Sequence, residues 1–230
     1  TLFAVSQDEL KPSLTGVLFK FSENLFTAVS TDGHRLVKHE RNDLLNEKLE
    51  KEIIIPKKFL SFLLTQLFDE DINISIGESF ITAQLKKDII ITKIIDEKFP
   101  DYNSVIPKDS NKTFLIDKKV LLGAIRRVAI FSNKSTHQVA LSLSTGGNFV
   151  TTEDPEKSSK AKEQIVGDFN GEEITIGYNS EYLKDIISHV SGETVEIKLN
   201  NPVSAALFEE IPKKENVKKL MLLMPIRLND

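Results

Sequence analysis

The chain has 230 residues and a formal net charge of −4, and its 40% hydrophobic and 28% charged residues are typical of a globular protein with one large or two ordinary domains. It contains no apolar run of the roughly 18 to 20 residues that a membrane helix needs, and no signal-peptide pattern at its start. The absence of cysteine excludes disulfides and thiolate chemistry and fits a reducing cytoplasm. The acidic balance argues against an evenly basic surface, although basic side chains can still gather locally.

The first hundred residues predict short strands and one amphipathic helix. Alternating or continuous apolar residues indicate strands over 17–21, 25–30, 53–56 and 72–76. A helix is predicted over 57–68, with Pro56 suited to its start. The charges Asp69, Glu70 and Asp71 that follow are interpreted as solvated loop residues.

The sequence Thr31-Asp32-Gly33-His34-Arg35-Leu36 follows the second predicted strand. Asp-Gly between apolar segments is a strong hairpin signal, because glycine accepts the positive φ that such turns need. The turn does not explain why a histidine and an arginine come next. These two side chains are therefore candidates for a functional site.

The second half predicts a strand over 112–116 and a helix over 117–132, with Asp117 as the N-cap. In that helix Val120, Ala124, Val128 and Phe131 recur at three- and four-residue spacing and are expected to face the core. Further strands are predicted over 139–143, 149–154, 174–177 and 195–199. A second helix is predicted over 180–190, with Asn179 as its cap.

The two halves repeat one pattern. Four pairs of segments correspond in the same order at a near-constant offset of roughly 120 residues, about the size of a domain. The first copy has only residues 2–6 where the second has a strand and a helix, so we expect it to lack its first strand and most of its first helix, and the natural protein to be longer. A polar linker over 107–111 divides the chain into domains 1–107 and 108–230. Many strands and few helices indicate an α+β fold with antiparallel sheets and helices on one face.

Catalytic, cofactor-binding and metal-binding motifs are not found. The chain has no P-loop, no Gly-x-Ser-x-Gly elbow and no Gly-x-Gly-x-x-Gly, and its four histidines lack metal-ligand spacing. Asp32 and His34 could form an acid–base pair, which leaves an enzyme as one alternative. A duplicated binding module with no nucleic-acid role is another. Because the second copy has no counterpart of Gly-His-Arg-Leu, this sequence is expected to serve a site rather than the fold.

Three segments together resemble one family. They are Thr31 to Leu36, Phe99-Pro100-Asp101-Tyr102 and Met224-Pro225-Ile226-Arg227-Leu228. In this order, on a duplicated domain, they resemble the bacterial DNA polymerase III beta subunit family, the replication sliding clamps, over residues 4–228. Members carry three such domains, and this chain resembles the middle and C-terminal ones.

The resemblance implies a non-catalytic processivity subunit without cofactors. Two full-length subunits would form a homodimeric ring, head to tail, that encircles duplex DNA irrespective of its sequence, with helices lining the channel and sheets outside. Because the subunit contact pairs the first domain with the third, this chain alone is expected to be monomeric. The location implied is the cytoplasm, at the nucleoid during replication, with no membrane partner.

In this family, partner proteins insert a short peptide, often of the Gln-Leu-x-Leu-Phe type, between the middle and C-terminal domains. The implied partners are the DNA polymerase III alpha subunit, the clamp loader and other proteins with such a motif. Apolar side chains would take the peptide's anchors, and His34, Arg35 and Arg227 its polar groups. The residues that match the pocket are Leu14, Thr31, Gly33, His34, Arg35, Leu36, Pro100 and Val105 on the middle domain, and Asn179, Tyr182, Val203, Ala205, Leu222, Met224, Pro225, Ile226, Arg227 and Leu228 on the C-terminal domain.

The resemblance also implies that basic residues on or beside the predicted helices face the DNA. Contacts of this kind, from lysine or arginine to phosphate, position a protein on DNA without reading its sequence, and they weaken with salt. The candidates are Lys57, Lys58, Lys118, Lys119, Arg126, Arg127 and Lys184.

Overall fold

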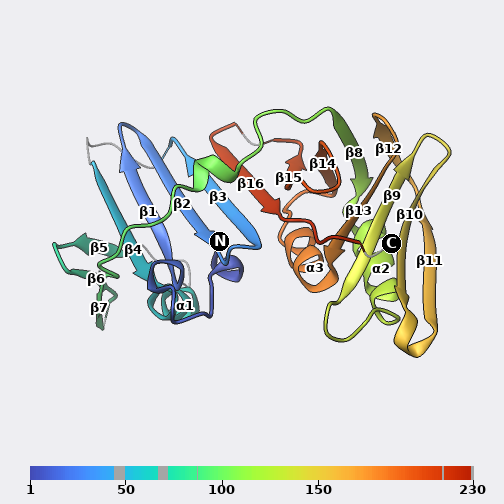
Figure 1. Ribbon diagram of the computed structural model, residues 1–230. Helices are drawn as coiled ribbons and strands as arrows, with labels where there is room; N and C mark the ends of the chain where they lie inside the picture. The colour runs from blue at the N-terminus through green and yellow to red at the C-terminus, as the bar shows by residue number, and fades with distance from the viewer. Residues whose placement is uncertain (44–49, 67–71, 87, 214, 229–230) are drawn as a thin grey trace. The chain divides into compact units, whose positions relative to one another are not determined.

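The computed structural model describes residues 1–230 except 44–49, 67–71, 87, 214 and 229–230 (Figure 1). The chain divides into two compact units. The first consists of Thr1–Asp101 with Glu215–Lys218, and the second of Tyr102–Lys214 with Lys219–Asp230. The division lies a few residues before the polar stretch over 107–111, because the short 3₁₀ helix Tyr102–Val105 clusters with the second unit.

The first unit contains two antiparallel sheets and one α-helix among its described residues. One sheet has the order β3-β2-β1-β4 and the other the order β5-β6-β7. The predicted strands are confirmed, and the predicted helix is confirmed over Lys57–Gln66; the rest of its predicted range and the charges Asp69, Glu70 and Asp71 lie outside the described residues. The elements are β1 Gly16–Ser22, β2 Leu25–Thr31, β3 Arg35–Arg41, β4 Lys51–Pro56, α1 Lys57–Gln66, β5 Asn73–Ile76, β6 Phe80–Gln84 and β7 Ile89–Lys93.

The second unit repeats this arrangement with additional elements. Its four-stranded sheet has the order β11-β10-β9-β13, and its other strands follow in the order β12-β8-β14-β15-β16, all antiparallel. The elements are β8 Lys112–Asp117, α2 Lys118–Ala129, β9 Gln138–Ser144, β10 Gly147–Asp154, β11 Ser159–Ile165, β12 Gly167–Asn170, β13 Ile174–Asn179, α3 Ser180–Ser188, β14 Thr194–Leu199, β15 Ala206–Ile211 and β16 Val217–Leu223. The predicted α+β fold of two similar copies is confirmed.

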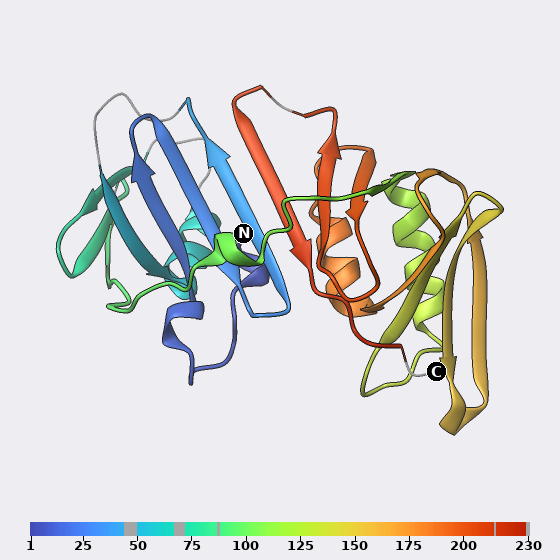
Figure 2. The same cartoon turned by 45° about the horizontal axis from the view of Figure 1, so that its top comes forward.

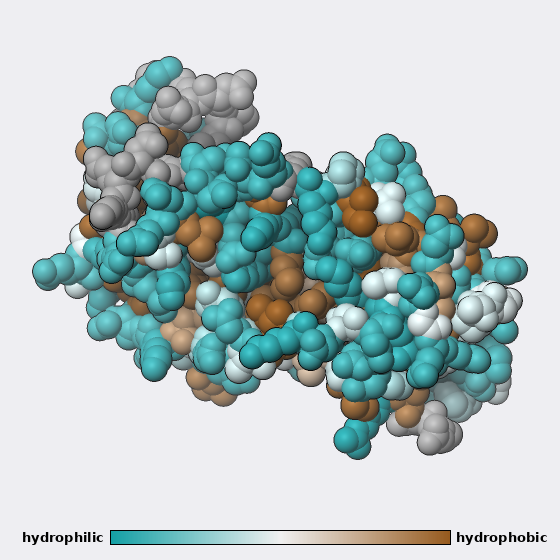
Figure 3. Space-filling model, turned by 90° about the horizontal axis from the view of Figure 1, so that it is seen from above, coloured by the Kyte–Doolittle hydropathy of each residue, from teal (hydrophilic) through white to brown (hydrophobic). Residues whose placement is uncertain are grey.

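The core of each unit lies between the helices and the sheets. In the first unit α1 buries Phe59 and Leu63 against strand residues such as Ile53 and Ile81. In the second, α2 and α3 lie side by side, and α2 also packs against strands of both sheets (Figure 2). Outside the core, hydrophilic side chains predominate on the face drawn in Figure 3, with hydrophobic patches between them.

Two details of α2 differ from the prediction. The helix ends at Ala129 rather than at residue 132, because the next amides bond three residues back, as in a 3₁₀ turn. The buried stripe contains Ala124 and Val128 as expected, together with Leu121 and Ile125, whereas Val120 and Phe131 are 42% and 47% exposed. At 100° per residue the latter two lie at the edge of the stripe.

The ends of the helices have identifiable causes. Asp117 caps α2 by accepting hydrogen bonds from the amides of Lys119 and Val120, and Asn179 caps α3 in the same way. Helix α3 ends at Ser188, two residues before the predicted end. There the Lys118 ammonium binds the carbonyls of Ser188 and Val190, which lack helical partners.

Replacing Asp117 with Ala is expected to destabilise the second unit by about 1 kcal/mol, since two amides at the start of α2 lose their acceptor. Asp117→Asn keeps a side-chain oxygen and should cost less. Urea unfolding followed by circular dichroism would measure both changes. Equal stabilities of the Ala and Asn variants would contradict the capping role.

Candidate functional site

The turn after β2 is built by its own side chains. Asp32 Oδ1 accepts hydrogen bonds from the amides of His34 (2.9 Å) and Arg35 (3.0 Å), and the Thr31 hydroxyl donates to Arg35 O (2.7 Å). Gly33 has φ +91°, a conformation that glycine adopts without strain. The hairpin predicted from Asp-Gly is confirmed, and it leaves Gly33 and His34 exposed at its tip.

Arg35 is directed into the protein rather than toward solvent. Its Nε donates to Asp32 Oδ2 at 3.0 Å, and its Nη2 donates to the carbonyl of Phe3 at 2.8 Å. The guanidinium also lies 5.5 Å from the centre of the Phe3 ring, within cation–π range. The side chains of Arg35 and Asp32 are only 10% and 13% exposed. Arg35 thereby fastens the turn to the first residues of the chain.

The same bonds bear on the alternative of an acid–base pair. Both carboxylate oxygens of Asp32 already accept hydrogen bonds, two from backbone amides and one from Arg35. A carboxylate whose two oxygens are both used in this way holds the turn in place. The geometry therefore gives Asp32 a structural role.

The segment Met224–Leu228, which follows β16, forms a partly exposed strip on the second unit. Ile226 pairs with Gly177 of β13 in an isolated antiparallel bridge, and its amide donates to Gly177 O at 2.9 Å. Met224 and Arg227 are exposed, whereas Pro225, Ile226 and Leu228 are half-buried. The last residues are thus held along the sheet with some side chains directed outward.

The other residues matched to the pocket differ in exposure. Leu222 and Ala205 are buried, at 2% and 7% exposure, whereas Val203 is 64% exposed. Asn179 caps α3 and also donates to the carbonyl of Thr136 at 3.4 Å. Tyr182 is half-buried in the first turn of α3.

On the first unit, Leu14 and Leu36 are buried, Thr31 is half-buried and Pro100 is exposed. Val105 is 50% exposed and belongs to the second unit rather than to the first.

The seven basic candidates fall into two groups. Lys118 binds carbonyls at the end of α3, Arg127 forms a two-bond ion pair with Glu163 (2.6 and 3.0 Å), and Lys184 pairs with Glu181 (2.7 Å). The hydrogen bonds from Arg127 lower the pKa of Glu163. Four candidates have no hydrogen bond or ion pair from their charged groups within the described part of the chain: Lys57, Lys58, Lys119 and Arg126.

Three residues that shape these surfaces were not predicted from the sequence. Phe3 receives the guanidinium of Arg35, Gly177 lies beneath the last residues, and Asn201 Oδ1 accepts the amides of Val203 and Ser204. A glycine within a strand signals close approach of another backbone, and an Asn before a Pro signals a turn, so two of the three had a recognisable signal. Phe3 had none.

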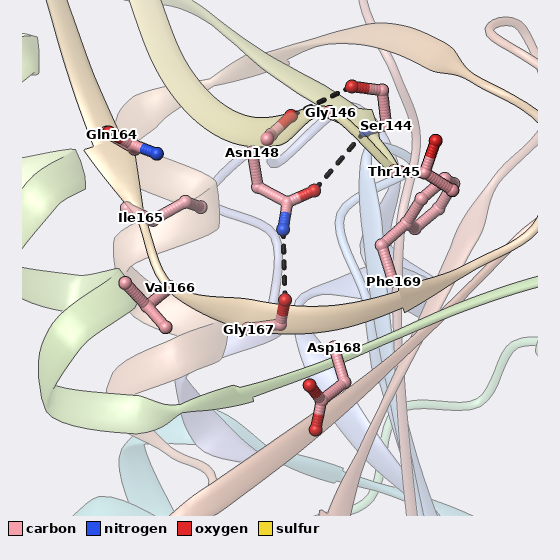
Figure 4. A pocket seen from close by; sticks show the side chains of 11 residues that line it. Ser144, Thr145, Gly146, Asn148, Gln164, Ile165, Val166, Gly167, Asp168 and Phe169 are labelled. Carbon is pink, nitrogen blue, oxygen red and sulfur yellow. Dashed lines mark hydrogen bonds between the residues drawn. The ribbon is translucent and has the colours of Figure 1, made fainter.

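A separate cavity of about 440 Å³ lies in the second unit (Figure 4). Its walls are the turn between β9 and β10 and the segment that joins β11 to β12. Asn148 connects the two walls, because its side chain accepts from the amide of Ser144 and donates to Gly167 O at 3.0 Å. None of the predicted site residues lines this cavity.

Within the described residues, no group of three or more His, Cys, Asp or Glu side chains could hold a metal ion. No helix among them is long and apolar enough to span a membrane.

Comparison with known proteins identifies the family. The family model for the DNA polymerase III beta subunit central domain matches residues 1–101, and that for the C-terminal domain matches residues 103–227. The chain therefore belongs to the DNA polymerase III beta subunit family, as the three segments suggested.

Curated relatives carry the name beta sliding clamp. The protein from Pseudomonas putida is 32% identical over 230 residues, which cover 99% of this chain and 62% of that protein. The one from Chlamydia muridarum is 29% identical and covers 100% of this chain and 62% of that protein. The chain thus spans about 62% of the length of these relatives.

Solved structures of sliding clamps are similar throughout the chain. A clamp from Pseudomonas aeruginosa, bound to griselimycin, has a TM-score of 0.92 and 30% identity and covers 99% of this chain, which corresponds to 61% of that protein. A clamp from Bacillus subtilis has the same TM-score and 28% identity. The matched region covers 100% of this chain and 60% of the Bacillus subtilis chain.

Replacing Arg35 with Ala is expected to destabilise the first unit by roughly 2 to 3 kcal/mol, because it leaves a mostly buried Asp32 carboxylate without its cation. Urea unfolding would measure the change. The control is Lys20→Ala, which breaks an exposed pair with Glu52 (46% and 50% exposed) and should cost less than about 1 kcal/mol. Equal effects of the two substitutions would show that Arg35 is no more than a surface charge.

Proposed function

We propose that this chain is the peptide-binding part of a DNA sliding clamp. In the full-length protein it would help to encircle duplex DNA and hold polymerases and other partners on it, without catalysing a reaction and without a cofactor. The proposed partners are the polymerase III alpha subunit, the clamp loader and other proteins with the peptide motif. The proposed location is the cytoplasm, at the nucleoid during replication.

The observation that carries this proposal is the form of the strip after β16. The exposed Met224 directly follows the buried Leu222 and Leu223, and the bridge from Ile226 to Gly177 holds the backbone just before the exposed Arg227. A backbone that is held in place beside buried apolar residues and carries one exposed cation suits a short peptide that has large apolar anchors and polar main-chain groups.

The turn on the first unit offers matching chemistry. Its backbone is fixed by Asp32 and Arg35, so the exposed His34 is carried on a rigid tip rather than on a loose loop. A rigid tip lowers the entropy that a peptide loses on binding. We propose that the turn and the strip contact the same peptide.

The unpaired cations support the proposed role on DNA. Lys119 and Arg126 are seven residues apart on α2, which places them on one face about 10 Å apart along the axis. That face is opposite the stripe buried by Leu121, Ala124, Ile125 and Val128. Lys57 and Lys58 begin α1 of the first unit. We propose that these four side chains face the DNA and that Lys118, Arg127 and Lys184 mainly hold the fold.

The proposed homodimer of full-length subunits is supported by an edge of the second unit. Strand β11 is the end strand of its sheet and has no neighbour on one side among the described residues. Ile130 and Phe131 are 67% and 47% exposed, and Ser159 of β11 donates to Phe131 O. An open strand edge beside exposed apolar side chains is typical of a surface that pairs with another chain.

A labelled Gln-Leu-x-Leu-Phe peptide is expected to bind this chain with a dissociation constant in the micromolar range, about −8 kcal/mol. His34→Ala and Arg227→Ala should each weaken binding about tenfold or more, since each removes an exposed polar group of one wall. Fluorescence anisotropy measures the affinity, with Lys134→Ala, at an exposed position in the loop before β9, as the control. A folded chain that shows no saturable binding would contradict the peptide site.

The double variant Lys119→Glu/Arg126→Glu is expected to weaken binding to a short DNA duplex at low salt. It should also reduce the slope of log K against log salt by about 2, since each lost phosphate contact removes about 0.9. Anisotropy of a labelled duplex at several salt concentrations measures the slope. The charge-matched control is Lys134→Glu/Lys160→Glu, and an equal loss in the control would mean that only net charge matters.

A further inference from the structure

We propose that Gly177 is a positioning residue for the strip Met224–Leu228: because it has no side chain, the strip can lie directly against β13. This inference rests on the proposed function, because it assigns to a residue outside the matched pocket the task of placing one of its walls. Gly177 itself lies in the middle of β13, between the fully buried Ile176 and Tyr178.

The contacts around Gly177 leave no room for a side chain. A Cβ atom there would lie 2.7 Å from the carbonyl oxygen of Ile226 and 2.7 and 3.0 Å from Cδ2 and Cγ of Leu228. These three nearest atoms all belong to the strip. Cβ atoms in real proteins essentially never lie under 3.0 Å from such neighbours, so any larger residue would have to move the strip.

The first unit shows that the bridge alone does not need a glycine. There the amide of Ile95, just after β7, donates to Ile54 O of β4 at 2.9 Å, in an isolated antiparallel bridge. This bond corresponds to the one from Ile226 to Gly177. The strands that accept the bonds, β4 and β13, each precede a helix, and the strands before the donors, β7 and β16, are each the last strand of their unit. The corresponding residue carries a full isoleucine side chain.

The glycine is therefore specific to the second unit. In that unit the side chain of Leu228, two residues after the bridge, lies against Gly177. A feature required only by the repeated fold should appear in both copies. Its restriction to the copy with the strip links it to the strip's position and hence to the exposed side chains of Met224 and Arg227.

The clash caused by a methyl group at position 177 would be relieved most readily by movement of the strip, which the bridge from Ile226 holds to β13. Leu222, by contrast, lies within β16. It is paired with Leu207 of β15 and is therefore held independently of that bridge. We therefore expect Gly177→Ala to displace residues 224–228 and to leave the two sheets of the unit intact.

The test compares Gly177→Ala with the wild-type chain in two measurements. Hydrogen exchange should show that protection of the Ile226 amide, the donor to Gly177 O, falls at least tenfold. Anisotropy with the labelled Gln-Leu-x-Leu-Phe peptide should show a dissociation constant at least ten times higher. The matched control is Gly192→Ala, whose Cβ would lie 2.8 Å from Ile211 O, far along the chain from the strip. It should leave both readouts unchanged in the folded protein.

Unchanged protection and affinity in folded Gly177→Ala would overturn the proposal. If that variant does not fold, two shortened chains are compared instead. Both the wild type and Gly177→Ala then end at Leu223. Without the strip, the alanine should be tolerated, with nearly equal midpoints of thermal unfolding. A large difference in the shortened pair would show that Gly177 serves the core instead.

The outcomes separate this proposal from the proposed function. A wild-type chain that binds no peptide would contradict the peptide site, whereas exchange at Ile226 would still decide whether Gly177 places the strip. If the chains ending at residue 230 both bind the peptide equally well, while protection is lost only in Gly177→Ala, the proposed function is kept and the link between the position of the strip and peptide binding is overturned.

Discussion

Each unit is closed by one backbone hydrogen bond that returns from the segment after its last strand to the strand before a helix. Ile95 makes this bond to Ile54, and Ile226 makes it to Gly177, at the same distance of 2.9 Å. It ties the end of each unit back to the strand that leads into α1 or α3. In the second unit the same bond also fixes the backbone of Met224–Leu228. A requirement of the fold thus provides the support for the proposed peptide-binding strip.

The turn Thr31–Leu36 combines support and presentation in a similar way. Asp32 and Arg35 are used inward, on amides, on each other and on Phe3 O, so the charges that identify the motif mostly hold it together. The exposed tip is Gly33 and His34. Buried polar groups that are fully paired make a local structure rigid. A binding surface that is already rigid loses less entropy when a ligand arrives.

The basic residues show why net charge says little about this chain's partners. The chain carries −4 overall, yet four cations near the starts and along the outer faces of α1 and α2 have no partner within the described residues, while three others are paired. A nucleic acid responds to where charge lies rather than to its sum. The paired cations hold the fold, and the other four are the ones proposed to contact phosphate.

Sequence patterns were enough to predict the strands with alternating or continuous apolar residues, the caps Asp117 and Asn179 and the hairpin at Asp32-Gly33, because each of these follows from residues that are close together in the chain. The repeat and the family were recognised by comparing whole segments. The folded structure was needed to show that Arg35 binds Phe3 O, 32 residues away, that Arg127 pairs with Glu163, 36 residues away, and that Lys118 binds the end of α3, 70 residues away. The task proposed for Gly177 depends likewise on a strip that follows another strand. Such partners are set by how the sheets fold back on themselves, which no local pattern encodes.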